Sequence, residues 1–140
     1  MEDEKSLFHL YVEYPEGSGN IMDIVGPKGR PDTALIIARV SIDQVHRTSY
    51  ASLTSTKRSE LVSEMMRTLI FQPVGFMVLP NLEAPESFQF VRDIYEDGLT
   101  KTSFMEALGQ VHRCVTYVVW KFNNAFSEGR PSEPPGTMYG

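Results

Sequence analysis

The stretch ALIIARVSI, residues 34–42, is rich in β-branched side chains and predicts a strand. Alternate residues of a strand point to opposite faces, and both faces of this one are apolar. One face holds Ile36, Ala38, Val40 and Ile42, and the other holds Leu35 and Ile37. If helices cover one side of a sheet, its free side is normally polar. This strand therefore carries more apolar surface than one helix layer requires.

Two shorter strands are predicted upstream. Residues 8–14 alternate between Phe8, Leu10, Val12 and Tyr14 on one side and His9, Tyr11 and Glu13 on the other. That period of two indicates a strand with one buried face. The turn signal PEGSGN, residues 15–20, separates it from NIMDIVG, residues 20–26. Three strands joined by short turns predict an antiparallel meander.

Downstream, DQVHRTSYASL, residues 43–53, predicts a short helix or turn capped by Asp43. A longer helix follows in TKRSELVSEMMRTLIF, residues 56–71, where apolar residues recur at spacings of three and four. Residues 74–80 and 87–95 predict two more strands. The last helix is expected from Ser103 to Phe126, with Thr100, Thr102 or Ser103 as its cap and a capping box from Ser103 to Glu106.

The order β-β-β-α-β-β-α predicts an α+β fold with an antiparallel five-stranded sheet and helices packed on one face. The length of 140 residues suits one domain, which we place at residues 7–126. Residues 1–6 are charged and residues 127–140 are rich in Pro and Gly, so both segments are expected to be disordered.

The net charge is −5 at pH 7, and such an acidic balance argues against general binding to nucleic acid or anionic membranes. One cysteine, Cys114, excludes an intramolecular disulfide and a cysteine metal cluster. The N-terminus is acidic where a signal peptide is basic, and no apolar run reaches the roughly 20 residues of a membrane span. These features predict a cytoplasmic protein.

The loop GPKGRP, residues 26–31, has the Gly-x-x-Gly spacing and basic residues found in loops that hold a phosphate backbone. Such a loop needs flanking helices, whereas both neighbours here are predicted strands. Pro27 and Pro31 also remove backbone donors that a phosphate would need. We interpret the segment as a hairpin loop, with weak nucleic-acid binding through Lys28 and Arg30 as the alternative.

No catalytic pattern is present. His9, His46 and His112 lie on three different predicted elements without a second ligand at helical spacing, so no metal site and no cofactor are expected. Cys114 is interpreted as a core or boundary residue. The alternative enzyme hypothesis uses His46, Tyr50 and Asp93 at the sheet–helix junction as acid–base groups.

The surplus apolar residues favour binding over catalysis. We predict a protein interface anchored by Leu35, Ile37, Tyr117 and Trp120, because large apolar side chains dominate such contacts. Self-association as a homodimer and binding of a protein or peptide partner both fit this prediction. The alternative is that loops or the N-terminal segment cover the same residues.

The element order resembles the type III secretion chaperone-like fold, and more narrowly an uncharacterised archaeal family of unknown function near that fold. The resemblance rests on ALIIARVSIDQVHRTSYASL, residues 34–53, and on IYEDGLTKTSFMEALGQVHRCVTYVVW, residues 94–120. It covers residues 7–126 and implies a homodimeric, chaperone-like module that binds extended segments of partner proteins. Members of that fold begin with a helix, and no helix is predicted before the first strand here. Its absence would leave apolar surface bare where that helix packs.

Overall fold

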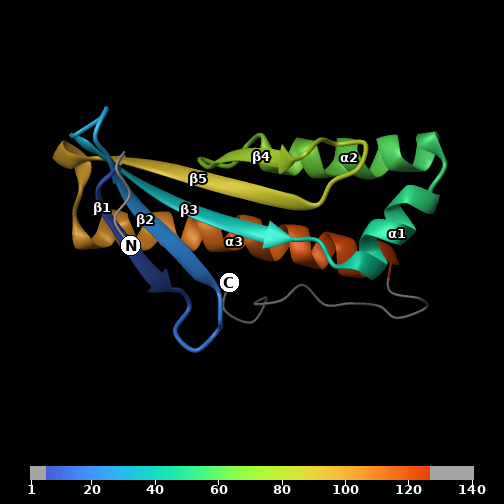
Figure 1. Ribbon diagram of the computed structural model, residues 1–140, viewed down its shortest axis with the longest axis horizontal. Helices are drawn as coiled ribbons and strands as arrows, with labels where there is room; N and C mark the ends of the chain where they lie inside the picture. The colour runs from blue at the N-terminus through green and yellow to red at the C-terminus, as the bar shows by residue number, and fades with distance from the viewer. Residues whose placement is uncertain (1–5, 127–140) are drawn as a thin grey trace.

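The three N-terminal strands form the predicted meander. In the computed structural model, which describes residues 6–126, β1 (Ser6–Glu13), β2 (Ile21–Pro27) and β3 (Thr33–Ser41) pair in succession and antiparallel. The strand β5 (Ser87–Tyr95) pairs with the other side of β3, and β4 (Gly75–Leu79) forms the far edge. The sheet order is β1-β2-β3-β5-β4, so the apolar stretch at residues 34–42 lies in its middle strand, β3 (Figure 1).

Two helices, not one, connect β3 to β4. The segment predicted as a short helix or turn is the helix α1 (Gln44–Ser52), and it is followed by α2 (Ser55–Leu69). Asp43 caps α1 as predicted, because its carboxylate accepts the backbone N–H of Val45 at 2.8 Å. The α+β class is confirmed, with the order β-β-β-α-α-β-β-α.

The last helix, α3 (Lys101–Phe126), begins two residues earlier than predicted and is capped by Thr100, one of the three predicted caps. The Thr100 hydroxyl accepts the backbone N–H of Ser103 at 3.0 Å, and the Ser103 hydroxyl accepts the N–H of Thr100 at 2.8 Å. The predicted box from Ser103 to Glu106 is therefore wrong. Ser103 lies at the third helical position and returns the hydrogen bond itself, a role more often taken by Glu or Gln. A short turn, η1 (Glu96–Gly98), joins β5 to this helix.

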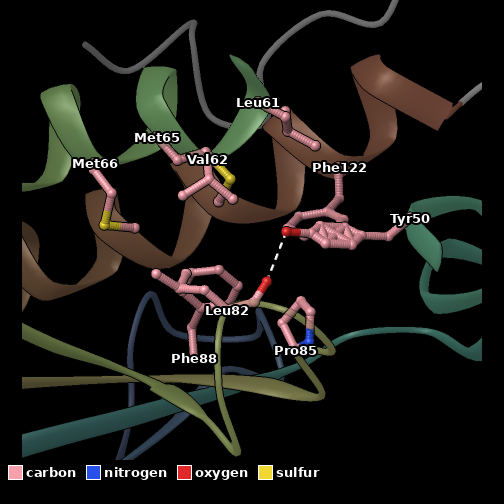
Figure 2. A pocket seen from close by; sticks show the side chains of 9 residues that line it. All are labelled: Tyr50, Leu61, Val62, Met65, Met66, Leu82, Pro85, Phe88 and Phe122. Atoms are coloured by element: carbon pink, nitrogen blue, oxygen red, sulfur yellow. Dashed lines mark hydrogen bonds between the residues drawn. The ribbon is translucent and has the colours of Figure 1, made fainter. Parts of the chain in front are cut away.

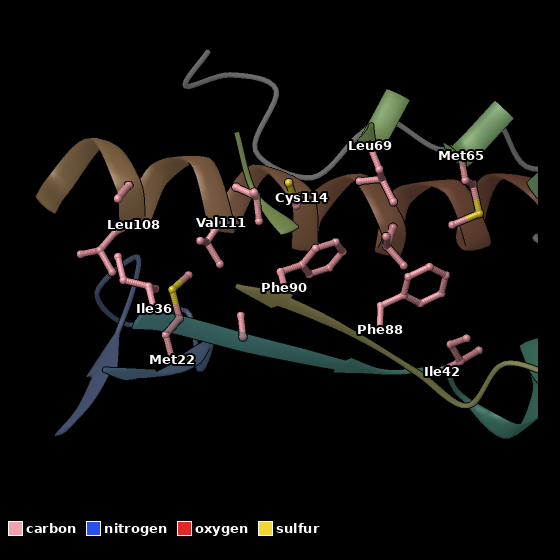
Figure 3. Packing of buried hydrophobic residues seen from close by; sticks show 14 of the residues in the cluster. Met22, Ile36, Ile42, Met65, Leu69, Phe88, Phe90, Leu108, Val111 and Cys114 are labelled. Carbon is pink, nitrogen blue, oxygen red and sulfur yellow. The ribbon is translucent and has the colours of Figure 1, made fainter. Parts of the chain in front are cut away.

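The core lies between the sheet and the helices (Figure 3). The even-numbered side chains of the strands face the helices, and Ile36, Phe88 and Phe90 are buried at 0%, 2% and 0% exposure. The other buried residues of this core are Met22, Ile24, Ala38, Ile42, Val74 and Ile94 from the sheet side, Tyr50 from α1, Leu61, Met65 and Leu69 from α2, and Ala107, Leu108, Val111, Cys114, Val118 and Phe122 from α3.

The helix-facing side of β1 departs from the prediction. Phe8 and Leu10 point to the same side as the core but remain 43% and 57% exposed. Only Val12, further along the strand, packs against the core. The cause is position, because β1 is the edge strand, whereas α3 packs against β3 and β5 in the middle of the sheet. Phe8 lies over Gly26 of β2, where an added Cβ would be 2.2 Å from its ring.

The two segments predicted to be disordered, residues 1–6 and 127–140, lie outside the described residues except for Ser6, which begins β1. Within residues 6–126, no helix combines the length and the apolar character needed to cross a membrane.

Candidate functional site

The face of the sheet that points away from the helices is apolar at its centre. The register pairs Val25 with Leu35 and Ile37 with Val91, so four apolar side chains from β2, β3 and β5 lie together. We call Val25, Leu35, Ile37 and Val91 the open-face patch. All four are partly exposed, and no helix of the described chain packs on them. An antiparallel sheet with one free face normally carries polar residues there, so the patch is unusual.

Polar contacts surround the open-face patch. Arg39 donates a hydrogen bond to Gln89 at 2.7 Å, and Arg30 forms an ion pair with Asp93 at 2.9 Å. His9 lies 3.8 Å from Asp23 near the β1 edge of this face. An apolar centre with a polar rim is the arrangement found in protein–protein interfaces.

The loop between β2 and β3 is the predicted hairpin loop, and it directs Arg30 onto the sheet. The Arg30 guanidinium donates hydrogen bonds to Asp93 at 2.9 Å and to the Tyr95 hydroxyl at 3.3 Å. It also lies 5.9 Å from the centre of the Tyr95 ring. The bond to Asp93 raises the pKa of Arg30 from its ordinary value. One of the two cations of the nucleic-acid hypothesis is thus already paired within the chain, while Lys28 is exposed.

Four exposed apolar side chains gather on β1, and the predicted interface did not include them. Tyr11, 61% exposed, is on the open side, Phe8 and Leu10 are exposed on the helix side, and Leu7, 55% exposed, lies at the register shift between Ser6 and Phe8. We call these four residues the β1 edge. The signal was present in SLFHLYVE, which carries apolar residues on both sides and contains one histidine, one acidic residue and no lysine or arginine.

The structure separates the four predicted interface anchors into two pairs. Leu35 and Ile37 belong to the open-face patch, whereas Tyr117 and Trp120 are on α3, on the other side of the sheet. The rings of Tyr117 and Trp120 are 6.3 Å apart. The Tyr117 hydroxyl also donates to the backbone carbonyl of Glu64 on α2 at 3.4 Å. Because the two pairs lie on opposite sides, one flat contact cannot include all four.

The helix α3 holds α2 through an ion pair beside Tyr117. Lys121 on α3 bonds to the Glu64 carboxylate, and this contact lowers the pKa of Glu64. Tyr117 therefore takes part in packing between the two helices, which is a structural role independent of any partner.

The three residues of the enzyme hypothesis are not brought together. Tyr50 is 3% exposed, and its hydroxyl donates to the backbone carbonyl of Leu82 at 2.7 Å (Figure 2). Burial raises the pKa of Tyr50. His46 stacks against Phe122 with ring centres 6.3 Å apart. Asp93 is on the open face beside Arg30, whereas Tyr50 and His46 are in the helix layer.

The enclosed pocket under α2 is part of the packing. Its volume is about 10 Å³, close to the space that one water molecule needs. Apart from the Tyr50 hydroxyl, apolar side chains line it: Leu61, Val62, Met65, Met66, Leu82, Pro85, Phe88 and Phe122 (Figure 2). A space this small and apolar offers no groups to orient a ligand.

Cys114 is a core residue, as predicted. It is 2% exposed, and burial raises the pKa of its thiol to about 11, so it is not a reactive nucleophile at neutral pH. In the part of the chain that the structure describes, no three His, Cys, Asp or Glu side chains are close enough to hold a metal ion.

Comparison with known proteins adds the family. The profile of a family described as "Uncharacterized conserved protein (DUF2299)" matches residues 1–122. The chain belongs to the DUF2299 family. A crystal structure of an uncharacterized protein from Methanothermobacter thermautotrophicus is similar to this DUF2299 chain with a TM-score of 0.83 and 28% sequence identity. The match covers 90% of this chain and 86% of that one. No curated protein matches the chain.

These matches agree with the predicted resemblance to an uncharacterised family, and the similar structure comes from an archaeon. Neither match concerns secretion chaperones, so that part of the resemblance stays a prediction.

Proposed function

We propose that this DUF2299 protein is a non-catalytic protein-binding module with a chaperone-like role in the cytoplasm, and that it works as a homodimer. Its binding surface for another polypeptide is the open-face patch. The observation that carries the proposal is the uncovered apolar centre of the sheet, formed by Val25, Leu35, Ile37 and Val91. Burial of such surface is the main favourable contribution to protein association.

The arrangement of polar groups supports binding over catalysis. Around the patch, Arg30 is paired with Asp93 and Arg39 with Gln89, so these side chains are already oriented before a partner arrives. A pre-ordered rim lowers the entropy lost on binding. His46, Tyr50 and Asp93, the residues of the enzyme hypothesis, do not share a site, so their positions do not support that alternative.

The test is binding of an unfolded model polypeptide, reduced and carboxymethylated, to the wild-type chain and to the double variant Leu35→Ser, Ile37→Ser. We expect the double variant to bind at least about tenfold more weakly, because two central apolar contacts are lost. Val45→Ser is the matched control, since it makes the same apolar-to-serine change at a residue of α1 that is 68% exposed and lies outside the open-face patch. Circular dichroism confirms that each variant is folded.

A second variant tests whether the helix side of the sheet takes part in binding. Trp120→Ala changes a predicted anchor on α3 and is expected to leave binding unchanged. Equal binding by wild type and the Leu35→Ser, Ile37→Ser variant would contradict the proposed site. A loss of binding in Trp120→Ala alone would move the site to the helix layer.

A further inference from the structure

The two edges of the sheet are built very differently. β4 has five residues and is followed by Pro80, with Pro73 two residues before it, and short strands and prolines protect an edge from pairing. β1 has eight residues, no proline and four exposed apolar side chains, and its one irregularity is a register shift against β2 between Ser6 and Phe8, at the start of the strand. A long apolar edge strand presents unpaired backbone groups to any strand that fits. β1 therefore has the properties of an interface, and β4 does not.

We propose that β1 pairs antiparallel with β1 of a second copy of this chain, so that two five-stranded sheets form one sheet of ten strands. The inference rests on the homodimer part of the proposed function and assigns its contact surface. A two-fold axis perpendicular to the sheet produces this pairing, and it keeps the helices of both copies on the same side.

The side chains of β1 fit a register centred on His9. In that register Phe8 lies opposite Leu10 of the second copy on the helix side, and Leu7, at the register shift of β1, comes opposite Tyr11 of the second copy. Every exposed apolar residue of the β1 edge then has an apolar partner, and cross-strand pairs of this kind stabilise a sheet.

The charges on β1 are compatible with this pairing. The Glu13 carboxylate is turned into the following loop, where it accepts the N–H of Gly17 at 3.2 Å and that of Gly19 at 2.8 Å. At the centre of the register, the two His9 rings approach each other, and each lies 3.8 Å from Asp23 of its own chain. Among the described residues of β1, no two carboxylates lie opposite each other in this register.

The exposed area suits a reversible dimer. Phe8 and Tyr11, 43% and 61% exposed, together offer about 200 Å² of aromatic surface, taking roughly 200 Å² for a whole aromatic side chain. Leu7 and Leu10 add an area of similar size, and backbone hydrogen bonds between the strands contribute further. This surface lies at the lower end of specific interfaces, so we expect dissociation constants of about 1–100 µM.

The pairing also extends the proposed binding surface. Because the two-fold axis keeps the same face of each sheet on the same side, the open-face patches of both copies share one surface. A partner polypeptide can then contact two patches at once, which strengthens binding through effective concentration.

The experiment compares Leu10→Lys with Met77→Lys by sedimentation equilibrium. The two residues are on opposite edge strands and have nearly equal exposure, 57% and 55%. We expect Leu10→Lys to raise the dissociation constant about 100-fold or more, because each dimer loses two buried leucines. Met77→Lys is expected to dimerise like the wild type. A monomeric wild type at about 100 µM, or equal effects of the two variants, would overturn the proposal.

Cross-linking tests the register. A chain carrying His9→Cys is expected to form a disulfide-linked dimer under mild oxidation, because directly opposite residues have Cβ atoms about 4.5–5.5 Å apart. Glu13→Cys, far from the two-fold axis, is expected to remain unlinked, and the buried Cys114 does not compete. A dimer that cross-links through Glu13→Cys but not through His9→Cys would contradict the pairing.

The outcome separates this inference from the proposed function. If the wild type is monomeric but its binding of the unfolded polypeptide depends on Leu35 and Ile37, the edge pairing is wrong and the binding surface stands. If the chain dimerises through β1 but binds no polypeptide, the proposed binding surface is wrong and the edge pairing stands.

Discussion

The two faces of the sheet are made by the same strands but differ in what covers them. Phe90 and Val91 are neighbours on β5. Phe90 is fully buried against the helix layer, whereas Val91 is partly exposed in the open-face patch. Alternation decides which face a residue occupies, but it does not decide whether another element covers that face. An apolar residue on the covered face stabilises the fold, and one on the open face is available to a partner.

The largest expected effect is on the covered face. We predict that Phe90→Ala lowers the free energy of unfolding by about 3–5 kcal/mol, the usual cost of removing a buried phenylalanine and leaving a cavity. Val91→Ala, one residue further along, is expected to cost about 1 kcal/mol or less because the side chain is partly in water. Urea denaturation followed by circular dichroism measures both values. Similar losses for the two variants would mean that the faces are not distinct.

A smaller effect is expected where the covered face reaches the edge. A methyl group at Gly26 would lie 2.2 Å from the ring of Phe8, so Gly26→Ala must displace that ring. The ring is partly exposed and can move outward, so we expect a loss of about 1 kcal/mol in the free energy of unfolding, at the low end of overpacking costs.

A double variant isolates that contact. Adding Phe8→Ala to Gly26→Ala removes the overlap, so the effect of the alanine at position 26 should disappear in the Phe8→Ala background. An unchanged effect there would show that the loss comes from the backbone of β2 and not from the ring.

Much of the fold followed from residue patterns. The alternation in residues 34–42 correctly put Ile36 and Ala38 on a different face from Leu35 and Ile37, because that strand is in the middle of the sheet and one of its faces is covered by helices. The order of strands across the sheet had no such signal, since it depends on which strand edges meet in three dimensions. The helix α1 was predicted only as a short helix or turn, because residues 43–53 form a short and mostly polar segment.

The candidate site was predicted only in part. Leu35 and Ile37 followed from a middle strand that is apolar on both faces. The β1 edge was missed because an alternating pattern looks the same on an edge strand as on a central one. Tyr117 and Trp120 were grouped with Leu35 because the sequence does not say that α3 and the open face lie on opposite sides of the sheet. Only the tertiary arrangement supplies that information.

The smallest expected effect concerns His112, at the margin of the covered face. Its Nδ1 lies 3.4 Å from the side-chain amide of Asn20, and its Nε2 lies 3.3 Å from the Thr116 hydroxyl. Burial, and secondarily the charge of Arg113, lower the pKa of His112 from its ordinary value of 6.5. The folded chain therefore binds this proton less readily than the unfolded chain. The contribution of His112 to the free energy of unfolding is therefore fully present above about pH 6.5 and is lost as the pH falls below that value.

The ring is partly exposed, so solvent screening keeps this loss small. Chemical denaturation at about pH 7.5 and at about pH 5.5 measures it, with His112→Gln as the comparison. The variant should show a smaller decrease in stability between the two conditions. An equal decrease in both proteins would assign the pH dependence to other groups.

The most direct test of the central claim, that the uncovered apolar surface of the sheet serves association, is the solution mass of the wild-type chain by light scattering across a dilution series. The chain has a mass of 15.8 kDa. We predict a mass approaching twice that value at about 100 µM and falling toward the single-chain value on dilution, as expected for a reversible dimer. A mass of one chain at every concentration would contradict self-association through the exposed apolar β1 edge.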